Sequence, residues 1–270
     1  MNILDQIVAD KLKEVEERKS LVPTKLLEQS VHFSGKPLSM SHYIRREDKT
    51  GIIAEIKRKS PSKGTINKSV DVEKISIGYM QAGSSGLSIL TDKKYFGGTN
   101  EDLTKARNFN YCPILRKDFI VDEYQIVEAK SIGADTILLI AAALTPQQIK
   151  AFAGEARSLG MEVLLEVHNR EELESSLCEE IDLLGVNNRD LKTFNTDIKV
   201  SKELASHIPD DFVKISESGI SSPETIAELM DYGFEGFLIG ENFMKTGNPG
   251  RSAGKFIDQL RTILREKATV

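Results

Sequence analysis

The feature that most constrains the fold of this chain is the alternation of short apolar runs with amphipathic segments after about residue 50. Eight runs have the length and the branched-residue content of buried strands, and they lie at residues 52–56, 87–90, 113–115, 136–140, 163–167, 183–186, 213–215 and 236–239. Helical periodicity predicts helices at 72–82, 123–131, 146–159, 170–177, 198–207, 223–232 and 251–265. Strands that alternate with helices pair in parallel, and eight such units predict a closed (β/α)8 TIM barrel.

The main alternative is an open, doubly wound sheet. Such a sheet usually has about five or six strands and a glycine-rich first turn. No Gly-x-Gly-x-x-Gly motif follows residues 52–56, so the barrel is the favoured fold. Helix boundary signals agree with it, namely a hydroxyl residue before proline at 145–146 and 222–223 and a glycine after the helix at 133, 160 and 233.

The first 48 residues precede the first strand and are predicted to form a helical extension of a single domain that spans residues 1–270. Residues 21–38 are expected to form a second helix and a loop. The extension has to pack on the outside of the barrel or across one of its mouths, so it is either a stabilising plug or a cover over the site. Its first helix has apolar residues at helical spacing, which are Ile3, Leu4, Ile7, Val8, Leu12 and Val15.

Composition excludes several classes of protein. The net charge of −5 argues against a general nucleic-acid binder, which would carry a basic face. No apolar run approaches the roughly 18 residues of a membrane span, and the N-terminal segment lacks the apolar core of a signal peptide. The two cysteines, Cys112 and Cys178, lie far apart and are expected to be buried thiols of a reducing compartment. We therefore expect a cytoplasmic protein without a membrane or nucleic-acid partner.

An acid and a base follow the first predicted strand on one face. Side chains alternate along a strand, so Glu55 and Lys57 point the same way. Burying both is costly unless they are paired or used in chemistry. A structural salt bridge is the simpler interpretation for these two residues alone.

Polar residues also follow the other strands, where a barrel of this kind places its chemistry. Lys57, Lys117, Glu55, Glu166 and Asn187 are expected to converge on one mouth, where they can hold a carboxylate and move protons. We expect a lysine near other cations to have a lowered pKa and to serve as a general acid. A glutamate with a pKa raised by apolar neighbours would serve as a base.

Two glycines and two phenylalanines suggest how a ligand would be held. Gly219 and Gly240 follow the seventh and eighth strands, where these barrels often bind phosphate, although ordinary turns also explain them. Phe96 and Phe119 offer apolar surface to a planar group, although core packing is the alternative for each. No metal site is predicted, because the four histidines lie far apart, and His168 is expected to be a surface or supporting group.

Four motifs together resemble the indole-3-glycerol-phosphate synthase family of tryptophan biosynthesis. They are EIKRKSPS at 55–62, RKDF at 116–119, NNRDL at 187–191 and ESGI at 217–220, and the resemblance covers nearly the whole chain. It implies a carbon–carbon lyase, a carboxy-lyase, that closes the indole ring of 1-(2-carboxyphenylamino)-1-deoxyribulose 5-phosphate and releases carbon dioxide and water. It also implies that no metal or organic cofactor is needed.

The resemblance assigns roles to individual residues. Lys117 would be the general acid at the ribulose carbonyl, and Glu166 would be the base of the later dehydration. Lys57 would hold the substrate carboxylate and assist that dehydration, while Glu55 and Asn187 would orient the lysines and the sugar hydroxyls. The catalytic set also includes Ser218, and the substrate-binding set comprises Ser60, Phe96, Phe119, Arg189, Gly219, Leu238, Gly240 and Glu241. Within it, the two phenylalanines would flank the anthranilate ring, while Ser218, both glycines and the backbone of Glu241 would bind the phosphate.

Two departures from the family pattern and two alternative functions remain open. Asn188 and Glu241 stand where many or some members of the family have serine, which leaves the affinity for substrate unsettled. A phosphoribosylanthranilate isomerase would use a cysteine and an aspartate at strand ends, but Cys112 opens the third strand on the other side. A decayed, non-catalytic phosphate sensor would lack charged groups that this chain keeps. The expected assembly is a monomer or a homodimer.

Overall fold

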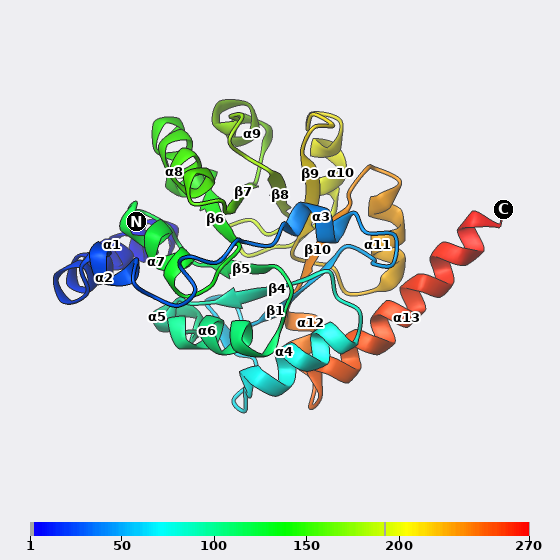
Figure 1. Ribbon diagram of the computed structural model, residues 1–270. Coiled ribbons are helices and arrows are strands. Elements are labelled where there is room, and N and C mark those ends of the chain that lie inside the picture. The colour runs from blue at the N-terminus through cyan, green and yellow to red at the C-terminus, as the bar shows by residue number, and fades with distance from the viewer. Residues whose placement is uncertain (1–2, 192, 270) are drawn as a thin grey trace.

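Eight parallel strands close into a barrel in the computed structural model, which describes residues 3–191 and 193–269 (Figure 1). The strands are β1 (Ile52–Ile56), β4 (Gly86–Leu90), β5 (Ile114–Lys117), β6 (Thr136–Ile140), β7 (Glu162–Val167), β8 (Leu183–Asn187), β9 (Val213–Glu217) and β10 (Gly236–Ile239). Each pairs in parallel with its neighbour, and β1 pairs with both β4 and β10, which closes the ring. The predicted (β/α)8 barrel is therefore confirmed, with every barrel strand at a predicted apolar run.

Helices surround the barrel as the periodicity predicts. The outer helices are α4 (Val72–Gln81), α6 (Asn100–Phe109), α7 (Tyr124–Ser131), α8 (Pro146–Ser158), α9 (Arg170–Ser176), α10 (Lys199–Ala205), α11 (Pro223–Met230) and α13 (Pro249–Ala268). Helix α6 was not predicted, because it is mostly polar and only Leu103 and Ala106 of its residues are buried. Among the described residues, no helix has both the length and the apolar character needed to span a bilayer.

Short elements complete the loops on the carboxyl side of the strands. A two-stranded antiparallel hairpin follows β1 and consists of β2 (Lys59–Ser60) and β3 (Gly64–Thr65). Helix α5 (Lys93–Phe96) follows β4, a 3-10 turn at Ala141–Ala143 follows β6, and helix α12 (Glu241–Met244) follows β10.

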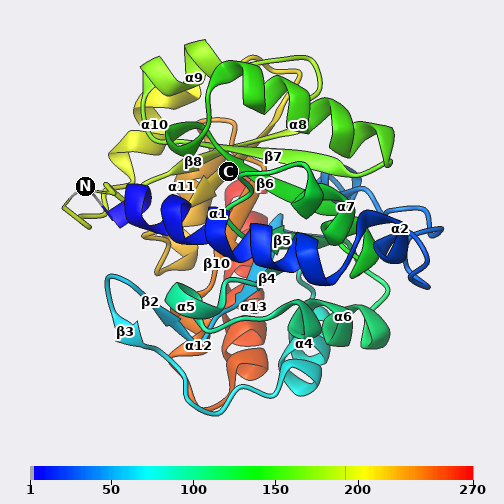
Figure 2. The ribbon, with the colours of Figure 1, turned by 90° about the vertical axis from the view of Figure 1, so that its left-hand side faces the viewer.

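The N-terminal extension contacts both ends of the barrel. Helix α3 (Met40–Ile44) closes the amino end, where Met40 and Ile44 pack against interior residues such as Ile53 and Leu164. Helix α1 (Ile3–Leu21) runs across the barrel at its other end. The short helix α2 (Thr24–Leu27) follows it (Figure 2). Segments of the extension therefore lie at both ends of the barrel.

One expectation for α1 was wrong. Leu12 was placed on the apolar face, but its side chain is 49% exposed, while Lys11 is only 1% exposed. The buried face comprises Leu4, Ile7, Lys11 and Val15. These positions repeat every three or four residues, so the helix keeps its periodicity and buries a lysine where the sequence suggests a leucine.

The strand periodicity of two divides the barrel interior into layers. The residues in the middle of the interior are apolar and include Ile53, Leu115, Leu138, Leu164 and Ile215. Two residues further along β1, β5, β7 and β9, the inward side chains are Glu55, Lys117, Glu166 and Glu217, because every second side chain faces inward. A buried apolar layer thus supports a charged layer at the carboxyl ends of the strands.

Candidate active site

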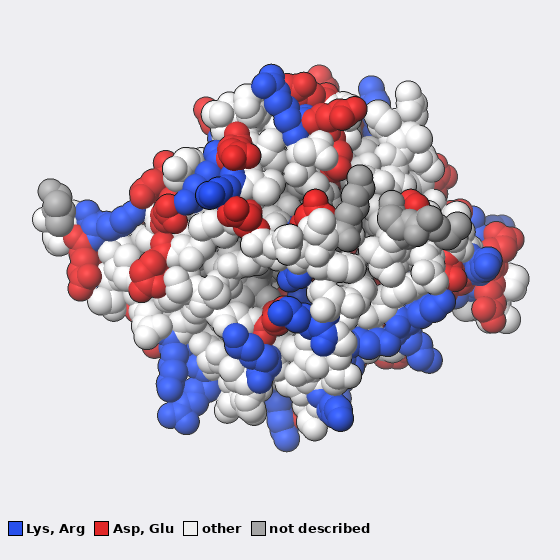
Figure 3. All heavy atoms as spheres, turned by 180° about the vertical axis from the view of Figure 1, so that it is seen from behind, with Lys and Arg blue, Asp and Glu red and all other residues white. Residues whose placement is uncertain are grey.

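A cavity opens at the carboxyl ends of the strands, on the side away from α3. Figure 3 shows this face, which is hollowed near its centre, with lysine and arginine side chains around the hollow. Helix α1 contributes Ile3, Leu4 and Ile7 to the wall. All fourteen residues predicted for the site line the cavity, namely Glu55, Lys57, Ser60, Phe96, Lys117, Phe119, Glu166, Asn187, Arg189, Ser218, Gly219, Leu238, Gly240 and Glu241.

Lys117 lies at the centre of the charged layer. Its Nζ is 2.8 Å from Glu166 Oε2 and 2.6 Å from Glu217 Oε2. Burial disfavours the ammonium, but the attraction of Glu166 and Glu217 outweighs it and raises the pKa of Lys117. The expectation of a lowered lysine pKa was therefore wrong, because carboxylates and not cations are the nearest charged groups.

Glu166 and Glu217 share this lysine and differ in their other contacts. Glu166 also accepts a hydrogen bond from Asn187 Nδ2 at 3.1 Å. Although burial opposes its charge, the attraction of Lys117 and of His168 lowers the pKa of Glu166 to about 2. The expected upward shift for Glu166 is therefore wrong as well.

Among the described residues of the charged layer, the carboxyl group with a raised pKa is that of Glu217, which was not predicted as a site residue. Burial, opposed by Lys117 and reinforced by the negative charge of Glu166, raises its pKa to about 7. Its buried Oε1 has no hydrogen-bond partner among the described residues. This oxygen lies 2.4 Å from the position that a Cβ on Gly185 would take. The sequence feature that could have identified Glu217 as a site residue is its position two residues after the apolar Ile215, on the inward face of β9.

Glu55 and Lys57 form a second ion pair in the cavity. Lys57 Nζ lies 2.7 Å from Glu55 Oε1, and Ser88 Oγ donates to Glu55 Oε2 at 3.3 Å. Glu55 is 2% exposed, so its carboxylate depends on Lys57 for compensation. A Cβ on Gly240 would lie 2.4 Å from Glu55 Oε1. Gly240 therefore leaves room for this carboxylate, a purpose that the sequence did not indicate.

Phe96 and Phe119 form one apolar wall of the cavity. Their ring centroids are 6.0 Å apart with an interplanar angle of 38°, so the rings pack against each other. A planar ligand group fits beside this pair and not between its members. Core packing and ligand contact, the two alternatives for these residues, are therefore compatible.

The backbone after β9 and β10 forms the opposite part of the cavity. Ser218 and Gly219 are both left-handed, with φ of 68° and 76°. A non-glycine residue rarely adopts this conformation, so the turn after β9 is held by its surroundings. Glu241 begins α12, and its carboxylate lies 3.9 Å from Lys63 Nζ and 4.0 Å from Arg189 Nη2. Two cations thus flank this end of the cavity.

His168 directly follows β7 and supports Glu166, which lies two residues before it. Its Nε2 is 3.5 Å from Glu166 Oε1, and its Nδ1 is 3.1 Å from Glu172 Oε2. Burial lowers its pKa, but the bond to Glu172 and the charge of Glu166 give a net rise. In the described part of the chain, no three His, Cys, Asp or Glu residues are grouped so as to hold a metal ion.

The chain is similar to proteins of one family over most of its length. A family model described as indole-3-glycerol phosphate synthase matches residues 4–256. A Bacteroides thetaiotaomicron protein of that name is 46% identical over 260 residues, which is 96% of this chain and 99% of the relative. A relative with the same name from Acetivibrio thermocellus is 41% identical and covers 97% of this chain and 100% of its own length.

A solved structure titled "Native KDPGal structure" has the same fold. It aligns with a TM-score of 0.58 at 15% identity and covers 83% of this chain and 99% of its own length. At this identity the similarity concerns the barrel fold alone.

Proposed function

The chain belongs to the indole-3-glycerol phosphate synthase family, whose members are decarboxylating carbon–carbon lyases of tryptophan biosynthesis, and we propose that the cavity at the carboxyl ends of its strands carries out the ring closure. The observation that supports this assignment most strongly is the Lys117 ammonium between two buried carboxylates, in the same cavity as the Glu55–Lys57 pair. The cavity thus combines a proton donor, proton acceptors and a second cation.

In the first step, the ring carbon that bears the carboxylate attacks the ribulose carbonyl carbon. A carbon–carbon bond forms, the carbonyl π electrons move to oxygen, and Lys117 donates a proton to that oxygen. Because the pKa of Lys117 is raised, this donor stays protonated throughout the neutral range. Carbon dioxide then leaves, and the electrons of its bond restore the aromatic ring.

The last step is a dehydration. The new hydroxyl group leaves with a proton from Lys57, and Glu166 accepts the proton lost from the five-membered ring. Asn187 keeps Glu166 oriented through its 3.1 Å hydrogen bond. Loss of the carboxylate as carbon dioxide consumes one proton, so one lysine regains its proton from Glu166 and the other from solvent. No oxidant or reductant is needed.

Substrate binding divides between two ends of the cavity. Phe96 and Phe119 contact one face of the anthranilate ring, and Lys57 attracts its carboxylate. At the other end, the backbone around Gly219, Gly240 and Glu241 receives the phosphate. The remaining assigned residues lie along this path, with Ser60 and Leu238 on the wall, Glu55 holding Lys57, and Arg189 and Ser218 near the phosphate end.

Turnover of the anthranilate–ribulose substrate by a Lys117→Met variant tests this assignment. Methionine keeps the length of the side chain but cannot donate a proton. We expect kcat to fall at least about a hundredfold, while an unreactive substrate analogue with an alcohol in place of the ketone still binds. Wild-type kcat in a correctly folded Lys117→Met variant would remove Lys117 from this role.

The proposal also covers the domain organisation, the cellular location and the assembly of the protein. We propose one barrel domain over residues 1–270, with residues 1–48 as an extension that covers the mouth and closes the amino end. Two free cysteines are typical of a reducing compartment, which supports a cytoplasmic location. We propose that the protein is a monomer or a homodimer.

A further inference from the structure

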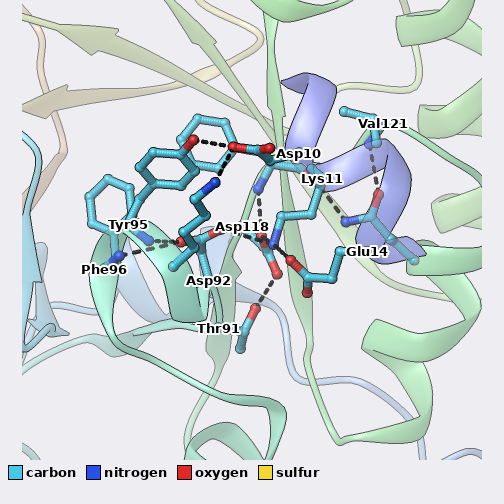
Figure 4. Close-up of polar contacts among 12 residues, drawn as sticks. Asp10, Lys11, Glu14, Thr91, Asp92, Tyr95, Phe96, Asp118 and Val121 are labelled. Carbon is cyan, nitrogen blue, oxygen red and sulfur yellow. Dashed lines mark hydrogen bonds and ion pairs between the residues drawn. The ribbon is translucent and has the colours of Figure 1, made fainter. Parts of the chain in front are cut away.

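Helix α1 places a lysine at the centre of a buried charge cluster beside the cavity. Lys11 Nζ lies 2.9 Å from Asp92 Oδ2, 3.0 Å from Asp118 Oδ1 and 3.0 Å from Glu14 Oε2 (Figure 4). The side chains of Lys11, Asp92 and Asp118 are at most 1% exposed. Burial disfavours its charge, yet Asp118 and Asp92 raise the pKa of Lys11 to about 12. A buried ammonium is therefore retained, and it connects α1 to the loops after β4 and β5.

Asp92 positions the turn that carries Phe96. Its Oδ1 accepts hydrogen bonds from the backbone N–H of Tyr95 at 2.6 Å and of Phe96 at 3.3 Å, so Asp92 caps helix α5. The other carboxylate oxygen of Asp92 contacts Lys11. The orientation of one wall of the aromatic site thus depends on a carboxylate that α1 neutralises.

Asp118 holds the segment after β5 in a similar way. It directly follows Lys117, and its Oδ1 accepts from the backbone N–H of Phe119 at 2.8 Å. Its Oδ2 accepts from Thr91 Oγ1 at 2.6 Å. Both phenylalanines of the aromatic wall are therefore held by a carboxylate that contacts Lys11.

The cluster extends into a closed ring of alternating charges. Asp118 contacts Arg116, Arg116 contacts Glu128, Glu128 contacts Arg18, and Arg18 contacts Glu14, which returns to Lys11. Three members come from α1 and three from β5, the loop after it and α7. A second contact joins α1 to α5, where Lys94 and Tyr95 both bond to Asp10. Docking of α1 is thus specified by charge pairing as well as by apolar packing.

We propose that Lys11 is a positioning residue of the active site, which couples docking of α1 to the placement of Phe96, Phe119 and Lys117. Without the ammonium, Asp92 and Asp118 are two buried carboxylates that repel each other, and among the described residues Asp92 forms no ion pair with another cation. The two turns then separate, and the aromatic half of the substrate loses its wall. This inference rests on the ring-binding role proposed above for the two phenylalanines.

The test compares Lys11→Met with Lys13→Met, a change at an exposed position of the same helix. Steady-state kinetics give kcat and KM for the substrate, and inhibition by glycerol 3-phosphate probes the phosphate end alone. We expect Lys11→Met to raise KM at least tenfold and to leave the inhibition constant of glycerol 3-phosphate within twofold. Lys13→Met should match the wild type in both.

Two results would overturn the inference: an unchanged KM in Lys11→Met, or an equal loss of affinity for substrate and for glycerol 3-phosphate, which indicates a merely structural role. If Lys11→Met does not fold, Asp92→Asn takes its place, because asparagine keeps the helix cap but removes the ion pair. An unchanged KM in Asp92→Asn then overturns the inference.

A Phe96→Leu variant separates this inference from the proposed function. A raised KM in Phe96→Leu with a normal KM in Lys11→Met refutes the positioning role and leaves the ring site intact. A normal KM in Phe96→Leu with a raised KM in Lys11→Met refutes the role of Phe96 and supports coupling through Asp118.

Discussion

Replacing Gly185 by alanine is expected to reduce activity much more than stability. Gly185 lies in the middle of β8 and carries no functional group, but a Cβ there would lie 2.4 Å from Glu217 Oε1 and 3.2 Å from Leu164 Cδ1. Ordinary contacts between carbon and oxygen start near 3.4 Å, so Oε1 has to withdraw by about 1 Å. The same carboxyl group holds Lys117 through Oε2 at 2.6 Å.

The size of the effect follows from that displacement. A shift of about 1 Å in a positioned group can cost about a hundredfold in rate, so we expect kcat of Gly185→Ala to fall about a hundredfold. The free energy of unfolding should fall by only about 1–3 kcal/mol, because the displaced atom is the end of a flexible side chain. Indole formation gives the rate, and urea unfolding gives the stability.

Gly154→Ala is the matched control. Gly154 lies in α8, and nothing lies within 4 Å of the position that its Cβ would take. This variant should keep its kcat and gain up to about 1 kcal/mol of stability. A Gly185→Ala enzyme with wild-type kcat would refute the reasoning, because Glu217 would then not need its observed position.

Two further predictions concern charge. The pKa of Glu217 is raised from 4.5 to about 7, so the folded protein holds this proton more tightly than the unfolded chain does. The free energy of unfolding should therefore fall as pH rises from about 4.5 to about 7, and Glu217→Gln should lack that part of the slope in urea titrations; identical slopes would contradict the shift. Glu241→Ser removes a carboxylate 3.9 Å from Lys63 and 4.0 Å from Arg189, which should lower KM several-fold at low ionic strength and less at high salt. A raised KM in Glu241→Ser would instead show that this carboxylate aids binding.

Much of the fold could be predicted because its signals are local. Each buried strand is a short apolar run, and helix ends are marked by residues such as Pro146 and Gly133. The alternation of strands and helices leaves few topologies open, and only closure had to be inferred from the count. Helix α6 was missed although it has a capping box at Thr99 and Asp102, because few of its residues are apolar.

Most members of the site could also be predicted, since the inward side chains at the carboxyl ends of parallel strands all reach one mouth, but Glu217 was not among them. Their protonation could not be predicted. The pKa of Lys117 depends on Glu166 and Glu217, and these residues come from strands β7 and β9. Local sequence indicates which groups are ionisable, but it does not indicate which charge lies nearest to which.

The sequence by itself therefore determined the barrel, its family and most of the polar residues that line its mouth, because periodicity and strand ends are properties of neighbouring residues along the chain. Only the tertiary structure decided that Lys11 is buried between Asp92 and Asp118, that α3 closes one end while α1 lies at the other, and that Glu217 has the raised pKa. The physical reason is that burial and Coulomb energies depend on distances between groups far apart in sequence, and folding alone sets those distances.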